Sequence, residues 1–481
     1  MAILLAGCAV ERADSINYIS NLTQNVLEYV DVSETQESQD LANGDSVNLD
    51  ENASQQPAES SLDSTKIAES NADSNAKVDS SVDSNGIDSA TDTLKKQYLD
   101  RYFNIWRDDF PIPKKSDIFW AIYNKKGFDE TKKPINEAFF NEVIESMSVD
   151  TYPSMRKKAV MVKTTSVRVL PTNKPRFSKS DGYPFDRWQN SLIFAYTPII
   201  VLHSTKNKEW LLIQSSFVSG WVKADEVAFL SVKNAKEMQN GEFILPLKDK
   251  IPLYYKGLFL ENAMIGMLLL KSEVKVTSRS KDANFTKPQI IAYKRDINGN
   301  AVKIAVDFTQ SDFAPFPMPF SEVNIAKTIA SIGTQNYGWG GMYDNRDCSS
   351  FIRDVFANVG IWLPRNSKAQ VLHGKIAQGS TYLALPKDND EKIAFIIKNA
   401  KPFRTIIWLK GHIMLYVGDI KGTPIVAHQV WGISNEKGSE ILGGVTITTL
   451  TPQVNITSPN FSDSGSKKTL LDKIEAINII K

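Results

Sequence analysis

Residues 337–367, YGWGGMYDNRDCSSFIRDVFANVGIWLPRNS, hold one of the two cysteines of this 481-residue chain. Asp347 is a favourable N-cap residue and Gly360 a favourable stop, so the stretch predicts a helix that begins at Cys348. The apolar face of this helix is formed by Phe351, Ile352, Val355, Phe356 and Val359. Cys348 is therefore expected in the first helical turn.

A cysteine in a first helical turn is placed well for nucleophilic chemistry. Free backbone amides and the positive end of the helix dipole favour the thiolate, which predicts a lowered pKa for Cys348. The same amides can receive a developing oxyanion. Position alone leaves a second interpretation open, because a lone cysteine is commonly a small buried hydrophobic residue.

A nucleophilic thiol needs a base, and the chain has four histidines. His203 falls in a predicted strand and His373 in a polar helical stretch, so we interpret both as structural or exposed. The other two lie on strands that flank a turn in residues 411–433, GHIMLYVGDIKGTPIVAHQVWGI. If Gly418 faces Gly422 across a three-residue loop, His412 lies directly opposite His428, with Cβ atoms about 4.5–5.5 Å apart.

One imidazole of such a pair can take the thiol proton while the other fixes its tautomer. A slip of one residue in the register would turn one histidine to the opposite face. Two histidines and a cysteine without ligand-like local spacing do not indicate a metal site, so we expect no metal and no cofactor.

Charge divides the chain unevenly. Residues 1–94 carry 18 acidic and 3 basic side chains, and the remaining 387 residues carry 37 acidic and 53 basic ones. A basic body suits a polyanionic wall polymer, a membrane face or a nucleic acid. The basic residues are scattered without a basic-aromatic cluster, so we expect no nucleic-acid partner. Two distant cysteines do not form a disulfide framework.

The N-terminus predicts a lipid anchor followed by a tether. Leu5-Ala6-Gly7-Cys8 matches the bacterial lipobox, in which the cysteine is acylated, although residues 1–8 are short for a signal and have no basic start. An ordinary buried N-terminus is the alternative. Residues 31–94 contain no Phe, Trp or Tyr, and residues 9–94 are expected to be an acidic disordered tether. No transmembrane helix is predicted.

Order is expected to resume with an aromatic stripe at helical spacing: Leu94, Tyr98, Leu99, Tyr102, Phe103, Trp106 and Phe110. Short Val- and Ile-rich strands separated by turns then predict two small β-barrels, and Asn298-Gly299 is a strong hairpin signal. The turn at 206–208 and the strand start at Gly220-Trp221 resemble the bacterial SH3-like barrel. The predicted division is a signal at 1–8, a tether at 9–94, a helical segment at 95–155, barrels at 156–236 and 237–312, and a catalytic domain at 313–481.

The sequence resembles the NlpC-type cell-wall cysteine peptidases. The resemblance rests on Tyr337-Gly338-Trp339-Gly340-Gly341, Asp347-Cys348-Ser349, Leu363-Pro364-Arg365-Asn366-Ser367 with Gln370, and the two histidines within Gly411-His412 and at His428. VRVLPTNKPRF (167–177) and GYPFDRWQNS (182–191) extend it to the first barrel, so it covers residues 95–481. Ser350 departs from the glycine usual in the family. The resemblance implies an α+β fold with a permuted papain-like catalytic domain.

The activity implied is hydrolysis of the γ-D-glutamyl to diamino-acid (meso-diaminopimelate) bond in peptidoglycan stem peptides. Cys348 would attack, His412 would act as base and acid, and His428 would orient it, while Tyr337, Asp347 and Ser349 would line the substrate pocket. The loop at 182–189 is expected to roof the cleft. We expect a monomer in the cell envelope, lipid-anchored at Cys8 on the periplasmic or outer membrane. A catalytically idle wall-binding lipoprotein and a related thiol amidase or acyltransferase are the alternatives.

Overall fold

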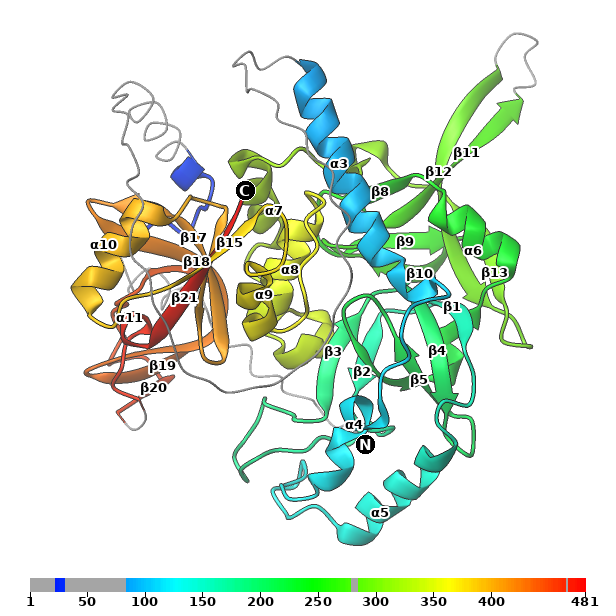
Figure 1. Cartoon of the computed structure of the whole chain (residues 1–481), viewed down its shortest axis with the longest axis horizontal. Helices are drawn as coiled ribbons and strands as arrows, with labels where there is room; N and C mark the ends of the chain where they lie inside the picture. The colour runs from blue at the N-terminus through cyan, green and yellow to red at the C-terminus, as the bar shows by residue number, and fades with distance from the viewer. Residues whose placement is uncertain (1–21, 31–83, 278–283, 464–465) are drawn as a thin grey trace, which may run out of the picture.

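The computed structural model describes residues 22–30, 84–277, 284–463 and 466–481 (Figure 1). The lipobox with Cys8 lies outside these ranges, as does most of the predicted tether. Within the described ranges, no helix combines the length and the apolar character needed to cross a membrane.

The described region that begins at residue 84 is helical. Its α-helices are α3 (Ser84–Tyr102), α4 (Lys115–Ile118) and α5 (Glu137–Ser146). Tyr102, Phe103 and Trp106 of the aromatic stripe are buried, which confirms that the stripe belongs to a core. The indole nitrogen of Trp106 donates a hydrogen bond of 2.8 Å to the Ile199 carbonyl. This bond fastens the helical region to the neighbouring sheet.

That sheet, which we call the first β unit, is antiparallel and has the strand order β3-β2-β6-β5-β4-β1-β7. Its strands are β1 (Lys157–Met161), β2 (Thr165–Arg168), β3 (Gln189–Ile193), β4 (Pro198–Ser204), β5 (Trp210–Gln214), β6 (Ser219–Lys223) and β7 (Val227–Phe229). The predicted turn at 206–208 joins β4 to β5. His203 is buried in β4 and bonds Ser154 and the Met147 carbonyl, which confirms its structural interpretation.

Helix α6 (Val232–Gln239) leads to the second β unit, with sheet order β13-β12-β11-β8-β14 and a separate β10-β9 pair. Its strands are β8 (Phe243–Pro246), β9 (Ile251–Tyr255), β10 (Leu258–Ala263), β11 (Leu269–Thr277), β12 (Asn284–Arg295), β13 (Ala301–Val306) and β14 (Phe313–Pro315). The hairpin predicted at Asn298-Gly299 joins β12 to β13, and Gly299 takes a φ of +86° there. β14 carries the sheet to Pro315, beyond the boundary expected at 312.

The C-terminal region is a sheet of order β15-β21-β16-β17-β18-β19-β20 with helices on both faces (Figure 1). Its helices are α7 (Glu322–Ile332), α8 (Cys348–Ala357), α9 (Ser367–His373), α10 (Asn389–Asn399) and α11 (Leu470–Lys473). Its strands are β15 (Ser380–Ala384), β16 (Thr405–Leu409), β17 (His412–Ile420), β18 (Thr423–Asn435), β19 (Gly438–Thr449), β20 (Phe461–Ser462) and β21 (Ile474–Ile480). Ser321 caps α7 as predicted. One core joins α7 and α8 to the sheet, and another joins α10 and α11 to it.

The tether prediction is wrong for residues 22–30. The Gln24 side-chain amide pairs with both backbone groups of Ile447 in β19, at 3.1 and 2.9 Å. Val26, Tyr29 and Val30 are buried in the core that contains α7 and α8. This short stretch is apolar enough to dock because the aromatic-free acidic sequence begins only after it.

The tether prediction is also wrong for residues 84–94, which form the first turns of α3. A helix propagates more easily than it nucleates, so the buried aromatic stripe can extend into polar sequence on its N-terminal side. The helix therefore begins about ten residues earlier than the apolar spacing predicts.

We expect Tyr29→Ala to release the docked segment. Truncating a buried aromatic side chain costs about 3–5 kcal/mol, a large loss for nine residues held by few contacts. Hydrogen exchange followed by mass spectrometry should show at least tenfold faster exchange of the amides of residues 28–30. Leu27→Ala, at a side chain that is 38% exposed, is the control and should change little. Unchanged exchange in Tyr29→Ala would contradict the docking.

Candidate active site

Cys348 is the first residue of α8, and Asp347 caps the helix as predicted. The Ser350 amide donates to Asp347 Oδ1 at 2.8 Å, and the Asp347 amide donates to Ser350 Oγ at 2.9 Å. Ser350, the departure from the family glycine, thus completes a reciprocal capping box. The box holds Cys348, a free thiol that is 7% exposed, at a defined place in the first turn.

The thiol is surrounded by backbone amides and a carboxylate. The amides of Ser349 and Ile413 donate to the sulfur, and Ile413 follows His412 at the start of β17. Burial, followed by the charge of Asp347, raises the pKa of Cys348 to about 12 and outweighs these amides. The predicted lowering of the pKa by the helix end is therefore wrong, because the capping carboxylate offsets the helix dipole and burial disfavours the anion.

Asp347 is held by Arg365, which the sequence analysis did not single out as a site residue. Arg365 Nη2 donates to Asp347 Oδ2 at 2.7 Å, and Nη1 donates to Ser349 Oγ at 2.9 Å. Burial tends to raise the pKa of Asp347, but the guanidinium of Arg365 outweighs it, so the pKa is lowered. Asp347 consequently stays ionised inside the protein. In the sequence, Arg365 is marked only by its place in the family-like stretch Leu363–Ser367.

The two predicted histidines lie together. His412 Nε2 and His428 Nδ1 are 2.9 Å apart, and His428 Nε2 is 3.2 Å from Thr448 Oγ1 in β19. Burial lowers the pKa of His412 to about 4, and burial followed by the neighbouring His412 lowers the pKa of His428 well below its usual value. Both rings are neutral at pH 7. Thr448 continues the hydrogen-bond chain that begins with the two histidines. No motif in the sequence predicts its place in the site.

The predicted strand register is wrong, although the histidines still meet. Ile420 pairs with Thr423, so the hairpin has two central residues, Lys421 and Gly422, both with positive φ. This is the geometry of a type I′ turn rather than a three-residue loop. A bulge between Tyr416 and Gly418 then shifts the register by one residue. Beyond the bulge His428 lies opposite residue 414, which is two positions from His412. Side chains two positions apart on a strand point to the same face of the sheet, so both rings lie on one face.

One aromatic side chain of the first β unit packs against aromatic residues of the C-terminal region near the site. The ring of Phe185 lies 5.1 Å from that of Trp339 and 6.0 Å from that of Trp431, which in turn is 5.9 Å from Tyr337. The indole of Trp339 donates to the Asp186 carbonyl at 2.8 Å. The 182–189 loop therefore contacts the glycine-rich segment ahead of Cys348. Its role in roofing a cleft stays a prediction.

Tyr337 contributes a protonated hydroxyl. Burial, then the charges of Cys348 and Asp347, raise its pKa far above the ordinary value. Gly341 in the same segment has a φ of +87°, and a Cβ there would overlap Leu192 of β3. Glycine thus permits the close approach of the first β unit. Within the described residues, no three His, Cys, Asp or Glu side chains group to hold a metal ion.

Three segments of the chain match known protein families. Residues 333–433 match the NlpC/P60 family, residues 70–152 match the N-terminal NLPC_P60 stabilising domain, and residues 175–223 match an SH3 domain of the SH3b1 type. No curated protein matches the chain.

A solved structure of an NlpC/P60 endopeptidase shows the same fold. An NlpC/P60 endopeptidase from Photobacterium damselae subsp. piscicida is 20% identical, with 83% of this chain and 93% of that chain covered and a TM-score of 0.67. An NlpC/P60 family protein from Bacillus cereus ATCC 10987 is 15% identical over 60% of this chain and 81% of that chain, with a TM-score of 0.37. The predicted α+β class, with an SH3-like and a papain-like domain, is confirmed.

The pKa values predict how Cys348 reacts with iodoacetamide. With the thiol pKa near 12 and the His412 pKa near 4, thiol and imidazole are both neutral from about pH 5 to 11. The alkylation rate should rise about tenfold per pH unit from pH 7 to 10, because only the thiolate reacts. Peptide-level mass spectrometry measures it, with free cysteine, which levels off above a pKa of about 8.5, as the reference. A rate plateau between pH 5 and 8 would reveal a preformed thiolate and contradict the expectation.

Arg365→Met should lower the free energy of unfolding by about 3–5 kcal/mol at pH 7, because it leaves the buried Asp347 carboxylate unpaired. Without Arg365 the folded-state pKa of Asp347 rises, so its protonation relieves the penalty as pH falls. Denaturant titrations at pH 7 and pH 4 should therefore show the difference from the wild type shrinking. Lys206→Met breaks an exposed pair with Glu145 and is the control, with an expected change below about 1 kcal/mol. If the loss in free energy of unfolding of Arg365→Met is the same at both pH values, the charge of Asp347 is not its cause.

Proposed function

We propose, from the premise that residues 333–433 belong to the NlpC/P60 family of cell-wall cysteine peptidases, that this chain cleaves the γ-D-glutamyl to diamino-acid bond of peptidoglycan stem peptides. The observation that carries the proposal is the thiol of Cys348, hydrogen-bonded by the Ile413 amide at the strand end that presents His412. The family assigns a role in the cell envelope, and the SH3-type domain suits binding to peptidoglycan.

The hydrogen-bond chain suggests how the proton moves. His412 Nε2 is engaged with His428, which leaves Nδ1 as the ring nitrogen to take the thiol proton. For Nδ1 to be free of a proton, Nε2–H must donate to His428 Nδ1, and His428 Nε2–H must donate to Thr448 Oγ1. His428 and Thr448 would thus fix the tautomer of His412 in which it acts as a base.

The reaction would proceed in two steps. The sulfur attacks the γ-glutamyl carbonyl carbon while its proton passes to His412, and the C–N bond breaks as His412 returns that proton to the leaving amine. Water, deprotonated by His412, then attacks the thioester and releases the γ-glutamyl carboxylate and the free thiol. The neutral resting pair means that the thiolate forms only as attack begins.

The substrate pocket would combine charge and neutral donors. We assign Tyr337, Asp347 and Ser349 to it, with the protonated Tyr337 hydroxyl as a donor beside the sulfur. Asp347 and Ser349 both bond Arg365, so their oxygens are already ordered before a peptide binds. Preordered polar groups of this kind stabilise developing charge without reorganising. A lipid anchor at Cys8, outside the described residues, completes the proposal.

Cys348→Ala should abolish release of stem-peptide fragments, with activity below roughly one thousandth of the wild type, because the nucleophile is lost. Mass spectrometry of digests of purified muropeptides measures this activity. His373→Ala, which removes a ring packed against Trp362 away from the site, is the matched control and should retain activity.

The product masses also separate the alternative functions. A fragment that ends in a free γ-glutamyl carboxylate supports the endopeptidase, whereas release of the sugar or transfer of the acyl group supports an amidase or an acyltransferase. Wall binding without any product would indicate an idle adhesin. Cleavage that persists in Cys348→Ala would overturn the proposed mechanism.

A further inference from the structure

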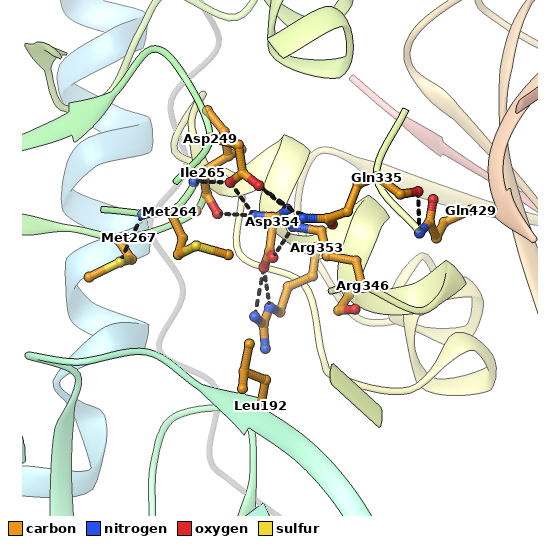
Figure 2. A network of polar contacts seen from close by, with 12 residues as sticks. Leu192, Asp249, Met264, Ile265, Met267, Gln335, Arg346, Arg353, Asp354 and Gln429 are labelled. Atoms are coloured by element: carbon orange, nitrogen blue, oxygen red, sulfur yellow. Dashed lines mark hydrogen bonds and ion pairs between the residues drawn. The ribbon is translucent and has the colours of Figure 1, made fainter. Parts of the chain in front are cut away.

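A buried cluster of charges joins the second β unit to the segment just before Cys348 (Figure 2). Arg346, which is 2% exposed, donates to both carboxylate oxygens of Asp249, from Nη1 at 2.9 Å and from Nη2 at 2.8 Å. Its Nε donates to Asp354 Oδ2 at 2.8 Å. Asp249 lies between β8 and β9, whereas Asp354 belongs to α8, so one guanidinium bridges the two units.

The charges in the cluster balance. Arg353 also donates to Asp354, at 2.6 and 2.9 Å, so two guanidinium groups face two carboxylates. Burial tends to raise the pKa of Asp249, but Arg346 outweighs burial and lowers it, so Asp249 is ionised at pH 7. Neutralising Asp249 would leave an uncompensated positive charge two residues before the nucleophile.

A second, uncharged arm of the cluster, formed by Gln335 and Gln429, runs from Asp249 toward His428. Gln335 donates to Asp249 Oδ2 at 3.1 Å and accepts from Arg346 Nη1 at 3.0 Å. The Gln429 amide donates to the main-chain carbonyls of Gln335 and Asn336 at 3.3 and 2.7 Å. Gln429 follows His428 in β18, and Figure 2 shows it reaching toward Gln335. The bonds therefore form a continuous chain from the second β unit to β18, the strand that carries His428.

The second β unit also holds the far end of α8. The Gly266 amide donates to Asn358 Oδ1 at 3.0 Å, and Gly266 takes a φ of +89° where a Cβ would press on Asp354. Arg346 Nη2 donates to the adjacent Ile265 carbonyl at 2.9 Å. The helix that carries Cys348 is thus fixed at both ends by the same unit.

We propose that Asp249 is a positioning residue that sets Cys348 and the His412–His428 pair in register, so that the second β unit takes part in catalysis through the Arg346–Gln335–Gln429 chain. This inference rests on the proposed function. It gives the second β unit a role in catalysis, because its contacts reach α8 and β18, which carry Cys348 and His428.

The test is Asp249→Asn, which keeps the shape and removes the charge. Because misplacement by about 1 Å costs up to about 100-fold, kcat for stem-peptide cleavage should fall roughly 10- to 100-fold with KM within about twofold. Asp249→Glu, which restores the charge, should recover part of the loss. Glu261→Gln is the matched control, since this carboxylate of the same unit bonds the Thr164 amide of the first β unit and not the site.

All variants are assayed well below their unfolding temperatures. If Asp249→Asn keeps wild-type kcat, or loses no more activity than Glu261→Gln, the carboxylate is merely structural and the proposal fails. Should Asp249→Asn not fold, Gln429→Leu tests the uncharged arm and should lower kcat at least fivefold. A wild-type kcat in Gln429→Leu would contradict positioning through the Arg346–Gln335–Gln429 chain.

A second readout separates this inference from the proposed function. Alkylation of Cys348 at pH 8 needs no substrate, so it can be measured even if wild-type protein releases no stem-peptide product. A rate that differs at least fivefold in Asp249→Asn and in Gln429→Leu from the rate in Glu261→Gln supports an effect of the chain on the position and surroundings of the thiol. Equal rates in all three variants would overturn the inference whatever the substrate is.

Discussion

The carboxylate of Asp347 is the contact on which the rest of the site depends. It caps α8, accepts from the Gly340 amide at 3.1 Å, and forms a buried ion pair with Arg365. Arg365 continues to Ser191 of β3 at 2.7 Å. A single ionised group thus joins α8, the glycine-rich segment and, through Arg365, the first β unit. Because a buried charge is costly without its partners, these three parts have one low-energy arrangement.

Helix α8, which carries Cys348, is consequently held from two sides. The first β unit reaches it through Ser191 and Arg365, and the second through Asp249 and Arg346. The first contact is a hydrogen bond from Arg365, which is itself ion-paired with Asp347, and the second is the ion pair between Asp249 and Arg346. Buried pairs of this kind specify geometry more reliably than they add stability. The modular appearance of the chain therefore understates how strongly its units depend on one another.

Local patterns in the sequence were sufficient for the main elements of the site. The apolar face after Cys348, the Asp347 cap and the presence of both histidines on neighbouring strands follow from spacing and capping rules. The bulge at 416–418 could not be predicted, because a bulge is chosen by the twist and packing of the whole sheet. The two histidines still share one face of the sheet because the observed pairing differs from the predicted one by two residues, an even number.

Contacts distant in sequence account for the remaining differences. Thr448 and Asp249 carry no local signal, and Arg365 is marked only by its family-like stretch; each acts through a partner that only the folded chain brings near. The thiol pKa was predicted in the wrong direction because the helix end was considered without its burial and its own capping charge. The docking of 22–30 was missed because composition was averaged over a long acidic region that hid nine apolar-rich residues.

That docked stretch changes the geometry of attachment. If an acyl chain is carried at Cys8, only the 14 residues from Cys8 to Leu22 separate the bilayer from a fixed point on the peptidase, a span of at most about 50 Å. Residues 31–83 would then connect two points on the same body, Val30 and the start of α3, and would add nothing to the reach from the anchor. Such an enzyme would cleave only the layers of the wall next to its membrane, because more distant layers would lie beyond its reach.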